Sequence, residues 1–109
     1  MLTPLATKLL LLATCHFLGD FPFQSVWMVM EKGKSWEVLL YHVCVYTVTF
    51  VPLLFVPDAS ITLIGLGVVF ASHFLIDTCK ARWNIIKTIW ADQLWHLFVL
   101  AVLALTGWM

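Results

Sequence analysis

Four long apolar segments alternate with polar connections along the chain. Each is close to the roughly 20 residues with which an α-helix crosses the hydrocarbon core of a bilayer. They cover residues 3–20, 37–56, 60–79 and 89–108. The turn between the second and third segments contains Asp58 and Ser60, either of which is expected to cap the next helix. The pattern predicts an all-α, polytopic membrane protein with four transmembrane helices in one domain over residues 1–109.

The basic residues lie mainly in two of the three connections and predict how the helices cross the membrane. The first connection (21–36) and the third (80–88) together contain five of the six lysines and arginines, whereas the short second connection contains none. Because Lys and Arg are retained on the cytoplasmic side, we expect the two long connections inside and both ends of the chain outside. Lys8 lies within the first apolar segment, where its long side chain can reach toward the outer interface.

The composition agrees with a membrane protein and excludes one large class of function. The chain is 62% hydrophobic and only 11% charged, whereas a soluble domain contains roughly 25% charged residues. The formal net charge is +0, so there is no basic surface of the kind that attracts a phosphate backbone. We therefore expect the lipid bilayer as the surroundings and no nucleic acid as a partner.

The apolar segments contain seven histidines and aspartates, and all of them fall toward the same face of the membrane. Because successive helices run in opposite directions, the end of one helix and the start of the next lie at the same depth. All four histidines of the chain belong to this layer, which consists of His16, Asp20, His42, His73, Asp77, Asp92 and His96. Ionisable residues within a membrane are costly and mark functional sites, so we expect a site near the cytoplasmic face.

Three His and Asp pairs in this layer are four residues apart, so both members of each pair project from one face of a helix. The pairs are His16 with Asp20, His73 with Asp77, and Asp92 with His96. Converging pairs of this kind hold di-metal sites in four-helix bundles. Imidazole and carboxylate ligands suit zinc, manganese or iron, and the three cysteines have no paired spacing that would indicate a thiolate site. We predict up to two divalent ions, bound by His16, Asp20, His42, His73, Asp77 and His96. The alternative is that each pair only joins helices by hydrogen bonds.

An internal repeat favours one shared site over separate pairs. HFLGD at 16–20 and HFLID at 73–77 agree at four of five positions, and LYHV of the second segment resembles LWHL of the fourth. The repeat predicts two helical hairpins in parallel orientation, related by a pseudo-twofold axis along the membrane normal. Asp92 breaks this symmetry, because Val38 occupies the corresponding position. We therefore expect Asp92 to act as a general base or as an asymmetric ligand.

The same motifs resemble a known family. HFLGDFPFQSVWM, HFLID followed closely by Lys80, and DQLWH are similar to the signatures of a small bacterial and phage inner-membrane family described only as a domain of unknown function. The resemblance covers nearly the whole chain and implies a multi-pass protein of the bacterial inner membrane, with no activity attached. In the layout of its polar residues alone, the chain also resembles inner-membrane metal-dependent hydrolases.

These observations favour a metal-dependent hydrolase that acts on a lipid head group or phosphoester at the cytoplasmic interface. Asp92 would serve as the base, and Lys80 would neutralise a substrate phosphate, although its position also fits ordinary membrane topology. One alternative is a noncatalytic interaction module of phage or stress-response type, which would bind a partner through residues 21–36. Another is a small transporter of metal ions or protons, although the polar layer is confined to one side. Either a single chain or a homo-oligomer is compatible with these readings.

Overall fold

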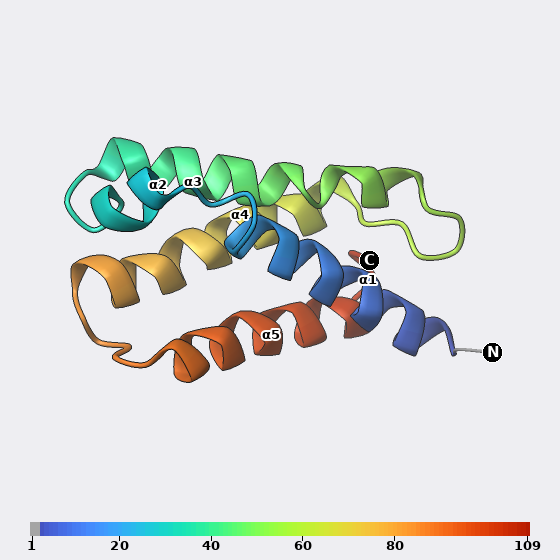
Figure 1. The fold of residues 1–109 in the computed structure, drawn as a ribbon. Coiled ribbons are helices and arrows are strands. Elements are labelled where there is room, and N and C mark those ends of the chain that lie inside the picture. Colours follow the sequence, from blue (N-terminus) through green and yellow to red (C-terminus); the bar gives the residue numbers. More distant parts are fainter. Residues whose placement is uncertain (1–2) are drawn as a thin grey trace.

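The computed structural model describes residues 3–109, and every regular element in this range is helical. Four long helices form a bundle, and a short helix lies in the first long connection (Figure 1). A 3-10 helix follows the second long helix, and a π-helix continues the third. In chain order the elements are α1 (Pro4–Asp20), α2 (Val26–Glu31), α3 (Trp36–Val48), η1 (Val51–Phe55), α4 (Leu63–Asp77), η2 (Thr78–Arg82) and α5 (Ile89–Leu105).

Each α-helix begins at a serine or threonine whose side chain accepts a hydrogen bond from a backbone N–H of the first turn. These caps satisfy donors that have no partner within the helix. The capping residues are Thr3, Ser25, Ser35, Thr62 and Thr88. The expectation that Asp58 or Ser60 caps the third long helix is wrong, because α4 begins only after Thr62. Asp58 lies in the preceding turn with a φ of 61°, a conformation that Asp tolerates better than most residues.

Pro52 divides the second apolar segment into two elements. α3 ends at Val48, and η1 begins at Val51. A proline has no backbone N–H, and its ring clashes with the carbonyl group four residues earlier, which here is that of Val48. The segment therefore leaves the α-helical path at that residue and continues as a 3-10 helix. Together the two elements still form a helical segment of 20 residues, Trp36–Phe55.

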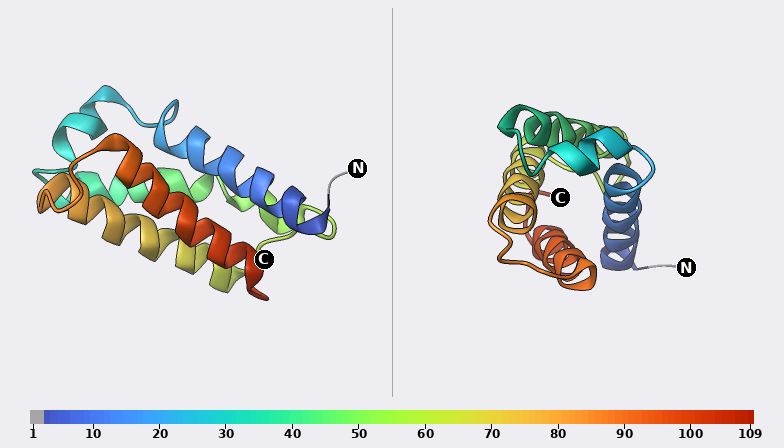
Figure 2. Two further views of the ribbon diagram at one scale, coloured as in Figure 1. Left: turned by 90° about the horizontal axis from the view of Figure 1, so that it is seen from below. Right: turned by 60° about the vertical axis from the view of Figure 1, so that its left-hand side comes forward.

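The four long helices surround a common axis. α1 and α4 each pack against both α3 and α5, so α1 and α4 face each other across the bundle (Figure 2). The bundle measures 42 × 23 × 22 Å, and its long dimension is close to the thickness of a bilayer with its head groups, about 40–45 Å. The start of α1 and the C-terminus lie at one end of the bundle, and α2 lies at the other (Figure 1).

The apolar core fills the half of the bundle that holds the chain ends. There Lys8 Nζ donates to the backbone carbonyl of Met109 at 2.5 Å, and the carbonyl of Trp108 accepts bonds from the backbone and side chain of Thr62. The buried cluster comprises Leu12, Cys15, Tyr46, Phe50, Leu53, Ile61, Val69, Leu100, Leu103, Ala104 and Met109. The buried ionisable residues lie in the opposite half, so the bundle has an apolar end and a polar end.

Apolar side chains also cover much of the exterior. Two helical segments, Trp36–Phe55 and Leu63–Arg82, are 20 residues long, and the most apolar 18 residues of each have mean hydropathies of 2.0 and 1.4. Only 39% and 28% of these two apolar stretches are buried within the bundle, so most of their apolar surface faces outward. α5 is also apolar but has 17 residues, as does α1. Where the sequence predicts four spans, two helices are thus long and apolar enough to cross a membrane.

Candidate metal centre

The seven histidines and aspartates of the apolar segments lie together inside the polar end of the bundle. Two come from the last five residues of α1 and two from the last five of α4, Asp92 lies in the first turn of α5, and His42 and His96 lie near the middle of α3 and α5. None is more than 4% exposed. They are His16, Asp20, His42, His73, Asp77, Asp92 and His96. Alternating helix directions therefore bring residues far apart in the sequence to one depth.

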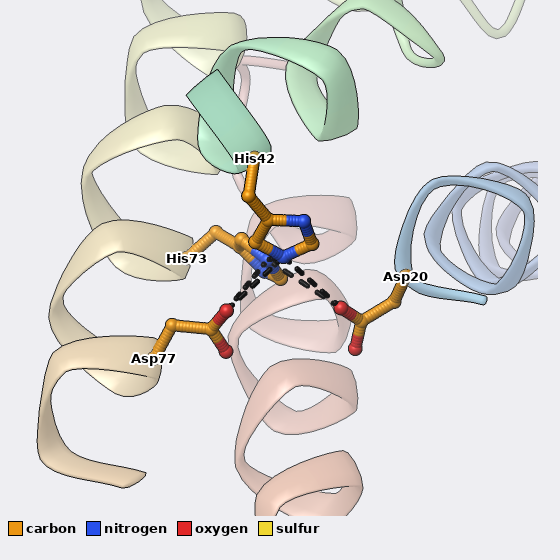
Figure 3. A group of neighbouring side chains, drawn as sticks. All are labelled: Asp20, His42, His73 and Asp77. Atoms are coloured by element: carbon orange, nitrogen blue, oxygen red, sulfur yellow. Dashed lines mark hydrogen bonds and ion pairs between the residues drawn. The ribbon is translucent and has the colours of Figure 1, made fainter. Parts of the chain in front are cut away.

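Four of these residues direct one ligand atom each at a common point (Figure 3). His42 Nε2 is 2.8 Å from His73 Nε2, 3.3 Å from Asp20 Oδ1 and 3.1 Å from Asp77 Oδ2. His73 Nε2 is 3.6 Å from the same Asp20 oxygen and 3.5 Å from the same Asp77 oxygen. Ligand atoms at about 2.0–2.1 Å from a tetrahedral zinc ion are about 3.3–3.4 Å apart. In these four side chains, which we call the first ligand group, the four nitrogen–oxygen distances are close to that spacing, whereas the two nitrogens are closer together, at hydrogen-bond distance.

A second group lies beside the first and contains Asp92 and His96 together with Asp20. His96 Nε2 is 3.3 Å from Asp92 Oδ1 and 3.4 Å from Asp77 Oδ1. These three atoms are buried, and none has a hydrogen-bond partner among residues 3–109. Because buried polar atoms are nearly always satisfied, three unsatisfied atoms that face one another indicate a place for a cation or a shared proton.

The two groups share their carboxylates. Asp20 belongs to both, and Asp77 directs Oδ2 toward the first group and Oδ1 toward His96. Carboxylates that bridge two positions are a feature of di-metal sites in four-helix bundles. Any charge that enters one group therefore acts directly on the other.

A hydrogen bond between two histidines gives the two groups different chemistry. The Nδ1 atoms of His73 and His96 are 3.2 Å apart, so one must donate and the other accept. A histidine that binds a metal through Nε2 carries its proton on Nδ1 and donates it to a neighbour. If His73 does so, His96 accepts on Nδ1 and carries its own proton on Nε2, between Asp77 and Asp92. This arrangement favours a metal ion in the first group and a proton in the second.

Two lysines neutralise part of the negative charge of the centre. Lys32 Nζ donates to Asp77 Oδ2 at 2.9 Å, and Lys80 Nζ donates to Asp92 Oδ2 at 3.2 Å. Lys80, which the sequence suggests as a phosphate-binding residue, is thus an ion-pair partner of Asp92 in this structure. Asp20 has no lysine or arginine partner in the described part of the chain, and its neighbours in the first group are the two histidines.

His16 occupies a different position from the one expected of a metal ligand. Its Nδ1 is 2.7 Å from the hydroxyl group of Tyr46, and its Nε2 is 2.6 Å from Gln93 Oε1. Both ring nitrogens are therefore engaged, and His16 is in neither ligand group. The amide nitrogen of Gln93 in turn donates to Asp20 Oδ2 at 3.1 Å and to Asp92 Oδ2 at 3.2 Å. His16 thus acts on the centre through Gln93, which it holds against the carboxylates.

Three further side chains shape the centre that are not among the residues predicted from the sequence: Lys32, Tyr46 and Gln93. Tyr46 stacks on the ring of His73, with centroids 3.6 Å apart and planes 10° apart. It follows His42 by four residues, so helical spacing could have placed it on the same face. Gln93 lies within the DQLWH motif. For Lys32 there is no such signal, because a lysine in a polar connection is ordinarily solvated.

A comparison with known proteins assigns the chain to a family. The model of the family described as "Protein of unknown function (DUF3307)" matches residues 7–109. No curated protein and no solved structure matches the chain. The matched region includes every residue of both ligand groups. The expected resemblance to a family of unknown function is confirmed, and the chain belongs to the DUF3307 family.

Proposed function

We infer that this protein is a membrane-embedded, metal-dependent hydrolase with its active centre at the polar end of the bundle. The observation that carries the proposal is the spacing of the first ligand group, Asp20, His42, His73 and Asp77, whose ligand atoms lie within 4.8 Å of one another. Simple interhelical pairs would each satisfy their own hydrogen bonds. Here the two histidines direct the same type of nitrogen at each other and at two carboxylates, which is the arrangement of a ligand set.

The donor atoms favour zinc, with manganese or iron as the alternatives. Two imidazole nitrogens and two carboxylate oxygens suit all three metals, and the near-tetrahedral spacing suits zinc best. When bound, such an ion activates water and polarises an ester or phosphoester. The residues of the chain then have separate roles: the first ligand group binds the metal ion, His96 orients His73, and Gln93 holds Asp20.

Asp92 and His96 are the proposed acid–base pair. His96 Nε2 is 3.3 Å from Asp92 Oδ1 and lies beside a carboxylate that the first ligand group also uses. One ligand atom of Asp92 lies within 4.8 Å of one of Asp20, so a buried carboxylate that is not itself one of the four ligands lies beside the first group and is placed to accept a proton from a nucleophile there. Lys80 holds the other oxygen of Asp92 and fixes its orientation. A transport pathway is less well supported, because the apolar cluster fills the other half of the bundle.

A bilayer is the proposed setting. The length and hydropathy of Trp36–Phe55 and Leu63–Arg82 support two crossings of the membrane. The bundle length of 42 Å supports crossings by all four long helices side by side. Both long connections lie at the polar end (Figure 1) and contain five of the six lysines and arginines, which supports a cytoplasmic position for the centre in the bacterial inner membrane. A lipid head group or phosphoester at that surface is the proposed substrate.

Elemental analysis of the full chain, purified in neutral detergent without added metal, tests the proposal. We expect a stoichiometric transition metal, and we expect chelation to lower the melting temperature, because ligand binding to the folded state stabilises it. A chain that purifies without stoichiometric metal and melts at the same temperature with and without chelator would show that the polar residues only join helices.

A further inference from the structure

A cleft of about 390 Å³ opens beside the metal centre, between the turn after α2 and the π-helix η2. Gln24, Lys32, Lys34 and Lys80 are among the residues that line it. A larger groove of about 460 Å³ lies on α5, but its lining of Trp90, Ala91, Leu94, Trp95 and Phe98 is apolar and suits lipid chains. The cleft with three lysines is therefore the opening whose chemistry matches an anion.

The cleft is connected to the centre through two of its lysines. Lys32 Nζ donates to Gln24 Oε1 at 2.7 Å and to Asp77 Oδ2 at 2.9 Å. Lys80 Nζ donates to Asp92 Oδ2 at 3.2 Å. The Lys32 side chain is only 10% exposed and that of Lys80 is 30% exposed. Each ammonium group therefore has the cleft on one side and a carboxylate of the centre on the other.

Metal binding changes the charge balance of this arrangement. Asp77 Oδ2 is both the partner of Lys32 and a member of the first ligand group, so a bound cation and the Lys32 ammonium compete for one oxygen. A buried ammonium group that loses its carboxylate needs another anion, because an unpaired buried charge is costly. An anion in the cleft meets this need while remaining next to the metal position.

We propose that this cleft binds the phosphate group of the substrate, and that an ion in the first ligand group strengthens this binding by releasing Lys32 from Asp77. The inference rests on the proposed function. The phosphate can belong to a free phosphoester or to a lipid head group. The geometry fits the second source, because neighbouring α2 exposes Val26, Trp27 and Met30, an apolar face that suits the membrane surface.

Binding of radiolabelled inorganic phosphate to the full chain tests the proposal. Equilibrium dialysis is performed in neutral detergent, on the metal-loaded protein and on the protein after chelation. We expect saturable binding that weakens about tenfold or more on chelation, because Lys32 then pairs with Asp77 again. We expect a similar loss in Lys32→Gln, because the anion loses a charge-assisted hydrogen bond. Lys80→Gln provides a second variant at a more exposed position, in case Lys32→Gln does not fold.

Lys87→Gln is the matched control, since Lys87 lies in the same connection as Lys80 but does not line the cleft. We expect unchanged phosphate binding in this variant. Adding short-chain phosphatidic acid to the micelles distinguishes the two sources: displacement of phosphate at concentrations well below those of a soluble phosphate monoester assigns the cleft to a lipid, and equal displacement assigns it to a soluble ester.

Two outcomes overturn the proposal and are distinguishable. If the protein retains stoichiometric metal but shows no saturable phosphate binding, or if both lysine variants bind as tightly as Lys87→Gln, the anion site is wrong and the metal centre stands. If elemental analysis finds no metal in the wild-type chain, the proposed function and this inference fail together.

Discussion

His16 and His73 occupy equivalent places in the repeated motif, yet their side chains have different roles. His73 lies in the first ligand group, whereas His16 is bound by Tyr46 and Gln93. In the alignment of the two halves, Leu100 corresponds to Tyr46. His73 therefore has no hydroxyl group at the matching position to occupy its ring nitrogen. The divergence of a few neighbouring residues thus decides which histidine remains available to a metal.

This difference predicts how two histidine variants will behave. His73→Ala removes a nitrogen of the first ligand group and should abolish stoichiometric metal, whereas His16→Gln should retain it with an affinity reduced about 10–100-fold, as for other residues that orient ligands. Metal content after dialysis against graded chelator measures both. Equal loss from the two variants would show that His16 is itself a ligand.

Asp92 can be tested by a nearly isosteric change. Asp92→Asn removes the proposed proton acceptor but leaves all four members of the first ligand group, so we expect retained metal and at least about a hundredfold lower hydrolysis of a chromogenic phosphate ester, as for loss of a general base. Parallel metal analysis and kinetics provide the measurement. Loss of metal would make Asp92 a ligand, and unchanged activity would exclude a catalytic role.

The depth of the polar residues could be predicted from the sequence, but their pairing could not. Helix alternation and spacing of four residues placed seven ionisable side chains in one layer, and the structure brings all of them except His16 into two groups. Which carboxylate is shared depends on lateral packing, for example on Gln93 reaching Asp20 from α5. Lys32 was overlooked because burial of its long side chain follows from the fold of its connection.

Close approach of helices at single glycines sets the geometry of the centre at the level of elements. A Cβ atom at Gly19 would lie 2.9 Å from Tyr46 Cδ2 and 3.1 Å from Tyr46 Cα, so α1 and α3 touch at this point. Gly19 directly precedes Asp20, and Tyr46 contacts both His16 and His73. The contact at Gly19 therefore sets the distance between α1, which carries Asp20, and α3, which carries His42.

Gly19→Ala should consequently destabilise the protein by about 1–3 kcal/mol through overpacking and should weaken metal binding. Gly67→Ala is the control, since a Cβ there has no neighbour within 4 Å. Within a helix that change should be stabilising by about 0.5–1 kcal/mol. Equilibrium unfolding in mixed micelles measures both. A Gly19→Ala protein as stable as Gly67→Ala would show that the helices can separate freely.

Element boundaries illustrate which features can be read from sequence. The end of α3 at Val48 follows from Pro52 four residues later, a local rule that was available in advance. The π-helix Thr78–Arg82 was not predictable from its own residues. It brings Ala81 against the turn after α2, where a Cβ at Gly33 would lie 2.6 Å from the Ala81 carbonyl oxygen. Such contacts depend on elements that are distant in the sequence.

For the whole molecule, the distribution of basic residues predicts the orientation in the membrane. We expect residues 21–36 and 80–88 on the cytoplasmic side and the 57–60 turn outside. Single cysteines at the exposed positions Lys34 and Ser60, in a chain whose three native cysteines are replaced, can be labelled with an impermeant reagent in oriented vesicles. Labelling of position 60 from the cytoplasmic side would show that the orientation is the reverse of the predicted one.

The division of the bundle into an apolar end and a polar end implies that its two halves open independently. The cluster around Leu12, Phe50 and Leu103 joins the helices without any contribution from the ligand groups. In amide hydrogen exchange, the apolar half should therefore exchange only through global unfolding, and its slow amides should persist after chelation. The last turns of α1 and α4 should exchange through local opening when metal is absent. Ligand exchange at the centre can then proceed by fraying of one end of a bundle that stays assembled at the other.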